Sequence, residues 1–314
     1  MGKYFVLIAA VLVAGRASAC DLCSCYCAMD AGKGEKGLFA SVAEQHTHYG
    51  TMQENGHRVA NEVDQRLDSL ITQFIVGWQF HDRVGVQVTV PYINRSFRRP
   101  EGFAIDRGTE AGLGDVTLSG LVRVLDWQEA ERALRVSLLG GVKFPTGNSA
   151  RIREETMEME VPGAPESGIH GHDLALGSGS VDGIVGGAVS VRWRRLYATA
   201  NVQYAIRSEG DFDYRYANDL VWSGGPGWYL VSNSNTTLGL QFNISGEHKG
   251  KDTFEGAKAE DTAVTMVYLG PELQVTWRNW LNAELGVDVP VVRDNSALQI
   301  VPDLRVRAAV TWRF

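Results

Sequence analysis

The sequence predicts an all-β fold: a transmembrane antiparallel β-barrel of about 12 strands. Three observations predict it. Apolar and polar residues alternate in blocks of about ten from residue 37 onward, the chain ends on Phe314, and the first residues have the pattern of a secretory signal. A tilted strand of this length crosses a bilayer, with its apolar face to lipid and its polar face to the lumen. We therefore expect a barrel in the bacterial outer membrane.

The composition excludes two other classes of protein. After the first residues the sequence has no long apolar run, and its mean hydropathy is -0.13, so it is not a helical membrane protein. The net charge is -7 and the 30 lysines and arginines are scattered, whereas nucleic-acid binding needs a concentrated basic face. We expect no nucleic-acid partner.

Residues 1–19 have the three parts of a signal peptide. Lys3 supplies the positive charge, residues 4–14 form a short apolar stretch, and Ala17 to Ala19 provide small residues for cleavage. The mature chain would start at Cys20. A lipoprotein is a weaker alternative, because Ala17 stands where a lipidation signal prefers Leu.

Residues 20–36 form a cysteine-rich segment that we expect in the periplasm. It contains all four cysteines of the chain, Cys20, Cys23, Cys25 and Cys27. Clustered thiolates are good ligands for copper or zinc. The oxidising periplasm favours the alternative, one or two local disulfides. No cysteine pair is followed by His, which argues against covalent haem.

Residues 37–314 form the predicted barrel. The expected strands start near residues 37, 69, 83, 115, 133, 180, 195, 226, 236, 262, 280 and 302. The last block alternates most regularly, with Leu304, Val306 and Trp312 on one face and Arg305, Arg307 and Arg313 on the other. Arginines on the inner face of a soluble β-sandwich would be costly to bury, whereas a hydrated lumen accommodates them. The barrel is thus favoured over the sandwich.

The connections alternate in length, as barrels with short periplasmic turns and long extracellular loops do. Short joints are expected at 81–83, 126–132, 193–195, 232–235 and 277–279, and long ones at about 50–68, 95–113, 146–178, 208–220, 246–261 and 292–300. Four tryptophans would lie near the periplasmic rim, where amphipathic rings favour the headgroup zone. They are Trp193, Trp277, Trp280 and Trp312.

Three glycine-rich motifs and the C-terminus support a family resemblance. The motifs are Gly112-Leu-Gly-Asp-Val-Thr-Leu118, Gly140-Gly-Val-Lys-Phe-Pro-Thr-Gly147 and Leu176-Gly-Ser-Gly-Ser-Val-Asp182, and the chain ends Thr311-Trp-Arg-Phe314. With these, residues 70–314 resemble the meta-pathway of phenol degradation family of outer-membrane barrels. The resemblance implies a transporter or channel, and the family's name suggests hydrophobic or aromatic solutes. The glycines themselves have a structural interpretation, as sites where a loop turns into a strand.

Charged residues at inward positions are the candidates for pore-lining groups. They are Arg123, Arg135, Lys143, Arg192, Glu272, Glu284, Asp288, Arg305 and Arg307. Rings of charge select permeant solutes. Mutual salt bridges that plug and stiffen the barrel are an equally good interpretation. Twelve strands enclose a lumen between the filled eight-stranded and the open sixteen-stranded cases, so wide general diffusion is not expected.

The longest loop contains a second candidate metal site. His170 and His172 follow a stretch with Met157 and Met159 among glutamates, and His46 and His48 form another His-x-His pair. Together these could collect copper or another transition metal at the pore mouth. An acidic, hydrated loop with incidental histidines explains the same residues.

No Gly-x-Ser-x-Gly or His-Glu-x-x-His element is present, so we predict no enzyme and no catalytic residues. The first functional hypothesis is a monomeric outer-membrane channel or transporter without a cofactor, surrounded by lipid and passing a small-molecule solute. The alternative is a metal-handling or electron-transfer accessory barrel, in which the N-terminal cysteines hold copper or zinc near a periplasmic partner.

Overall fold

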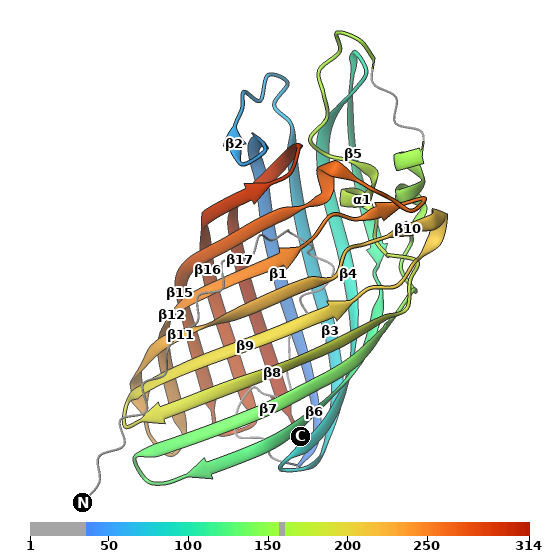
Figure 1. Cartoon of the computed structure of the whole chain (residues 1–314). Coiled ribbons are helices and arrows are strands. Elements are labelled where there is room, and N and C mark those ends of the chain that lie inside the picture. Colours follow the sequence, from blue (N-terminus) through green and yellow to red (C-terminus); the bar gives the residue numbers. More distant parts are fainter. Residues whose placement is uncertain (1–35, 157–160) are drawn as a thin grey trace, which may run out of the picture.

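The computed structural model describes residues 36–156 and 161–314, and twelve of its strands form one closed antiparallel barrel (Figure 1). The barrel strands are β1 (Gly37–Glu54), β3 (Arg66–His81), β4 (Val84–Glu101), β6 (Val116–Gln128), β7 (Arg132–Phe144), β8 (Asp182–Trp193), β9 (Leu196–Ile206), β11 (Asp219–Ser232), β12 (Thr236–Lys249), β15 (Val264–Trp277), β16 (Leu281–Asn295) and β17 (Leu298–Arg313). Each pairs with its neighbour in sequence, and β17 closes the ring against β1. The predicted fold class and strand number are confirmed.

Smaller elements lie in the loops. They are strands β2 (His57–Arg58), β5 (Ala104–Leu113), β10 (Tyr214–Arg215), β13 (Thr253–Phe254) and β14 (Ala257–Lys258), 3-10 helices η1 (Ala150–Thr156), η2 (Asp211–Asp213) and η3 (Glu260–Thr262), and helix α1 (Gly171–Leu174). Among the described residues, no helix is long and apolar enough to cross a membrane.

The side chains of the barrel strands point outward and inward as the alternation in the sequence predicts. On β9, Leu196 and Val202 are exposed on the outer wall while Tyr197 and Gln203 are buried inside. On β17, Leu304 and Trp312 are exposed outside while Arg305 is buried. Large apolar side chains therefore cover the exterior and polar ones fill the interior, because each successive side chain points to the opposite face of a strand.

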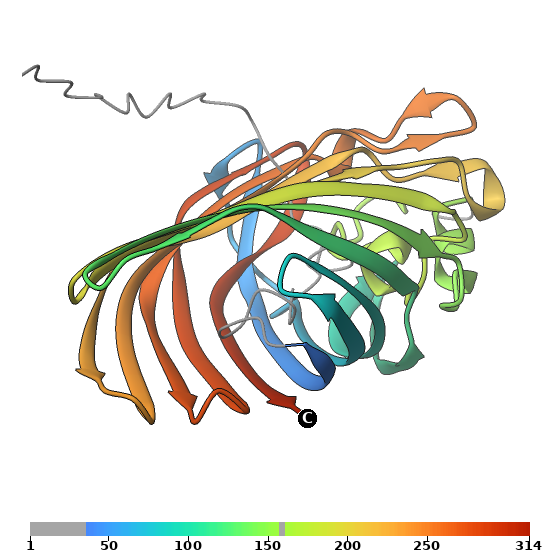
Figure 2. The same cartoon turned by 90° about the horizontal axis from the view of Figure 1, so that it is seen from below.

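Both ends of the barrel segment lie at one rim, where Phe39 on β1 pairs with Arg313 on β17. The short turns lie at the same rim, and Figure 2 looks along the barrel from it. In barrels of this type that rim is periplasmic. The four tryptophans predicted there end strands at the short turns or sit at the C-terminal end of the chain, and the rings of Trp277 and Trp280 lie 5.1 Å apart.

Three boundaries differ from the prediction. The expected long loop at 292–300 is a tight turn between β16 and β17, which the Asn295 amide stabilises by donating to the Ala297 carbonyl at 2.9 Å. The expected loop at 95–113 is a hairpin, because β4 continues to Glu101 and pairs with β5. Strand β11 starts at Asp219 rather than near 226, because pairing with β9 carries it through a Gly-Gly-Pro sequence that locally resembles a turn.

Candidate functional site

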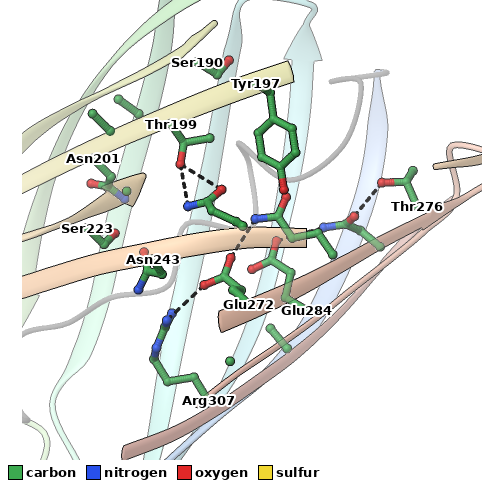
Figure 3. Close-up of a pocket in the computed structure, with 18 of the residues that line it drawn as sticks. Ser190, Tyr197, Thr199, Asn201, Ser223, Asn243, Glu272, Thr276, Glu284 and Arg307 are labelled. Carbon is green, nitrogen blue, oxygen red and sulfur yellow. Dashed lines mark hydrogen bonds and ion pairs between the residues drawn. The ribbon is translucent and has the colours of Figure 1, made fainter. Parts of the chain in front are cut away.

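The lumen contains a cavity of about 860 Å³ that reaches the periplasmic rim. At the periplasmic end the cavity is lined by Arg278 and the turn residues 232–236. Nearer the extracellular end it is lined by Ile71 and Trp222. Hydroxyl and amide side chains from inward positions cover much of the wall between them, as Figure 3 shows for residues of several strands. The polar ones include Ser190, Thr199, Asn201, Gln203, Ser223, Gln241, Asn243, Gln274, Thr276 and Asn282. This wall suits hydrated solutes.

Charged side chains lie on opposite parts of this wall. Arg135 and Arg192 come from β7 and β8, whereas Glu272 and Glu284 come from β15 and β16. In the ring order β7 and β16 are opposite, with β6, β4, β3, β1 and β17 between them on one side and β8, β9, β11, β12 and β15 on the other. The β15–β17 side also contributes Arg305 and Arg307, so a solute meets arginines on the β7–β8 side and both glutamates and arginines on the opposite side.

Two tyrosines stand between the charged groups. The rings of Tyr197 and Tyr229 lie 4.5 Å apart on the cavity wall, and Figure 3 shows the Tyr197 hydroxyl on the side of Glu272 and Glu284. The Tyr197 ring lies directly over two glycines. A Cβ atom at Gly227 would approach its Cζ atom to 2.2 Å, and one at Gly239 its hydroxyl to 2.7 Å. These glycines make room for the ring that narrows the cavity.

An ion-pair network lies along β15, β16 and β17. Arg307 donates to Asp288 at 2.7 Å and to Glu272 at 3.0 Å, and Arg305 donates to Asp288 at 3.1 Å. The Arg305 guanidinium also lies 3.9 Å from the centre of the Tyr268 ring. Each of these charges has an opposite partner, which lowers the cost of holding it inside the barrel.

Three of the predicted pore residues, Arg123, Lys143 and Asp288, lie outside the set that lines the cavity, and Asp288 is completely buried beside Arg305 and Arg307. Arg123 is buried near the periplasmic rim, where it donates to the Asp82 carbonyl and lies 3.7 Å from Asp126. Lys143 is buried at the opposite end, 2.8 Å from both Asp115 and Asp182. Their contacts are those of side chains that hold loops and strands together.

Residues 145–156 and 161–181 between β7 and β8, which we call the plug, fold against the inner wall at the extracellular end. Figure 1 shows its helix α1 at the end of the barrel away from the C-terminus. Ile169 and Leu174 are completely buried in a cluster with wall residues, and Leu176 packs on Ile71, which also lines the cavity. The wall residues of the first cluster are Tyr49, Leu67, Phe97 and Ile300. The plug therefore lies over the extracellular side of the cavity.

Two arginines of β4 hold the plug from the wall. Arg95 donates to the carbonyls of Asp173 at 2.6 Å and Ala175 at 2.7 Å. Arg99 donates to the Glu154 carboxylate at 2.7 Å. Neither arginine was predicted as an inward-facing residue, because a loop was expected to begin at residue 95. Continuing the β4 alternation from Gln87 and Thr89 to odd-numbered positions would have placed them inside.

The three glycine motifs meet at the base of the plug. Asp115 accepts hydrogen bonds from the backbone of Gly147 at 3.0 Å and Ser178 at 2.9 Å, and the ammonium group of Lys143 donates to it. Gly147 and Gly177 are in such close backbone contact that a Cβ atom on Gly147 would lie 2.8 Å from the Cα atom of Gly177. The motifs thus fasten both ends of the plug to the start of β6.

The predicted histidine pair is buried in the plug and brought close to carboxylates. His172 lies 2.9 Å from Glu155 and 3.3 Å from Asp173, and His170 lies 3.3 Å from Asp261 of the β12–β15 loop. Burial disfavours charge on these groups, but His172 lowers the pKa of Glu155 to about 2. Against the same burial, Asp173 and Glu155 raise the pKa of His172 to about 10. An imidazolium between carboxylates therefore exists at neutral pH.

The remaining candidate ligands are separate from this cluster. His46 and His48 lie on the outward face of β1, where His48 is 2.7 Å from Asp68. Met157 and Met159 lie outside the described residues. So do the predicted signal peptide and the four cysteines, and the metal role of Cys20, Cys23, Cys25 and Cys27 stays a prediction.

Comparison with known proteins identifies the fold. No family model matches the sequence and no curated protein matches it, so the resemblance to the meta-pathway of phenol degradation family stays a prediction. The structure is similar to an outer membrane channel from Pseudomonas putida F1, with a TM-score of 0.62 and 15% identity over 91% of this chain and 98% of that chain.

Two further solved structures show weaker similarity. The transport unit of the autotransporter AIDA-I from Escherichia coli has a TM-score of 0.43 at 9% identity, covering 89% of this chain and 91% of that chain. The Ralstonia pickettii toluene transporter TbuX has a TM-score of 0.36 at 9% identity, covering 91% and 93%. The closed barrel with its apolar exterior is the fold of an outer-membrane channel, and the predicted location in the bacterial outer membrane is confirmed.

Proposed function

We propose that this barrel is a channel that admits small polar solutes to the periplasm, with the plug as its extracellular gate. The observation that carries the proposal is the 860 Å³ cavity, which reaches the periplasmic rim and is lined by hydroxyl and amide groups together with arginines and glutamates. Such a cavity binds and orients a solute without reacting with it. The proposed role therefore includes no enzymatic step and no cofactor.

The lining favours dipolar or zwitterionic solutes over aromatic hydrocarbons. A molecule with separated positive and negative groups can contact Arg192 with its negative end and Glu284 with its positive end, while its other polar atoms find hydroxyl and amide partners. An aromatic hydrocarbon would displace water from these groups without replacing the hydrogen bonds of that water, which costs free energy. The hydrophobic solutes that the family resemblance implies are therefore the less favoured hypothesis.

Single-channel conductance of the refolded mature protein in planar bilayers tests the proposal. Discrete conductance is expected, with ion preference set by the lumen charges. Glu284→Gln should reduce preference for cations, and Arg192→Gln should reduce preference for anions. Glu131→Gln removes the same charge from an exposed periplasmic turn and serves as the matched control.

Two results would contradict the proposal. A folded protein that never conducts, even when the plug is loosened, would mean that the lumen carries no solute. An ion preference that stays the same in both lumen variants would mean that ions do not pass between the two charged groups. Faster migration of the unheated barrel in gels establishes that each variant is folded.

The alternative hypothesis, a metal-handling or electron-transfer accessory, depends on the N-terminal cysteines and a periplasmic partner. It predicts stoichiometric copper or zinc binding under reducing conditions, lost when Cys20, Cys23, Cys25 and Cys27 are changed to Ser. A channel should conduct equally well after these changes. Metal binding and conductance of the variant with all four cysteines changed to Ser therefore distinguish the two hypotheses.

A further inference from the structure

We propose that His170, His172 and Asp173 bind one divalent transition-metal ion that fastens the plug in the mouth of the barrel. One potential ligand atom from each residue lies within 4.8 Å of the other two. An ion with bonds of about 2.0–2.2 Å joins three such atoms after small side-chain movements. The proposal goes beyond the channel function and does not depend on which solute the barrel passes.

Both histidines have a carboxylate at Nδ1. Glu155 lies 2.9 Å from Nδ1 of His172, and Asp261 lies 3.3 Å from Nδ1 of His170. In metal sites a carboxylate at one ring nitrogen fixes the tautomer and leaves the other nitrogen to coordinate the ion. Nε2 of His172 is indeed turned to the third ligand, 3.3 Å from a carboxylate oxygen of Asp173.

The three side chains are held in place before any ion binds. His170 is 8% exposed and His172 is 6% exposed, and their rings stack with centroids 5.7 Å apart. The Tyr214 ring stacks on His172 at 6.3 Å. The second oxygen of Asp173 accepts the backbone N–H of His170 at 3.0 Å. A site ordered in this way loses little conformational entropy on binding.

The charge and donor types select the class of ion. Three carboxylates, those of Glu155, Asp173 and Asp261, lie within 3.3 Å of the two imidazoles, and their negative charge would stabilise a dication. Two imidazoles with one carboxylate suit zinc, nickel or copper, whereas magnesium and calcium prefer oxygen ligands throughout.

The position of the site gives the ion a structural consequence. Glu155 belongs to η1, the two histidines and Asp173 to the α1 region, and Asp261 to η3 in the β12–β15 loop. The ion would be bound by the α1 region alone, and it would link this region to η1 through the Glu155–His172 contact and to a separate extracellular loop through the Asp261–His170 contact. Its removal should therefore loosen the plug and increase the fraction of time that the channel is open.

Cobalt and zinc binding to the full mature chain tests the site, with all four N-terminal cysteines changed to Ser so that thiolates cannot contribute. We expect one equivalent of Co²⁺ per chain, with a visible spectrum of nitrogen and oxygen ligands, displaced by Zn²⁺. His172→Asn should abolish this binding. The double change His46→Asn and His48→Asn removes the exposed histidine pair and should leave it intact.

Asp261→Asn is the second variant, because it keeps all three ligands and removes only the carboxylate at His170. Loss of such a group should weaken binding by about 10–100-fold. The proposal is wrong if the cysteine-free protein binds no stoichiometric ion, if His172→Asn or Asp261→Asn binds as tightly as the parent, or if only the His46 and His48 change abolishes binding. In the first case the cluster is a proton-bearing ion-pair network alone.

Discussion

Loosening the plug at Arg95 is the most direct test of gating. The guanidinium is 4% exposed and donates to two plug carbonyls at 2.6 and 2.7 Å. Arg95→Gln leaves a side chain too short to reach both carbonyls. A hydrogen bond from a charged donor contributes about 1.5–3 kcal/mol, so the two together contribute about 3–6 kcal/mol.

Water that reaches the two carbonyls once the plug moves offsets part of this loss, which leaves an effect of about 3 kcal/mol. A shift of that size multiplies the ratio of displaced to seated plug by about 150. In planar bilayers, the Arg95→Gln variant should show a higher open probability and longer openings than the parent at the same voltage and salt concentration.

Arg98→Gln is the matched control. Arg98 is on the same strand but on the outward face, where it donates to Asp64 at 2.9 Å rather than to the plug. The Arg98→Gln variant should have the same open probability and the same length of openings as the parent. If Arg95→Gln, folded by gel migration, also gates like the parent, then either the plug is not the gate or Arg95 does not hold it, and the reasoning fails.

Two further predictions concern packing and buried charge. Gly227→Ala should displace the Tyr197 ring and change single-channel conductance, because the new Cβ would lie 2.2 Å from that ring; Gly140→Ala, which has open space around its Cβ position, should not. Lys143→Met should lower the free energy of unfolding by about 3–5 kcal/mol in denaturant titrations, because it removes the cation that pairs with buried Asp115, whereas Asp182 keeps its ion pair with Arg207. A loss below about 1 kcal/mol, typical of surface ion pairs, would contradict the structural role of Lys143.

The alternation of side chains was enough to predict the barrel. On β17, Arg305 and Arg307 face the lumen while Leu304 and Trp312 face lipid, as the sequence pattern indicates. Most strands begin within a few residues of their predicted starts, and the even strand number is confirmed. These features follow from the two-residue period of a strand, which depends only on neighbouring residues.

The candidate site could be predicted only in part. The charged lumen positions are visible in the pattern, but the uncharged lining and the position of Tyr197 over Gly227 depend on which residues three strands place side by side. Pairing register between strands is a property of the folded barrel, set by many hydrogen bonds and contacts at once. The sequence of one strand therefore does not show in which register it pairs with its neighbours.

The sequence by itself therefore determined the class of fold, the outward and inward faces and the approximate starts of most strands. Only the tertiary structure decided that three glycine motifs meet around Asp115 and Lys143, and that Asp261 reaches His170 across the mouth. The reason is physical. Alternation reflects local backbone geometry, whereas these contacts join residues tens of positions apart, and they form only after ring closure has fixed where each loop begins and ends.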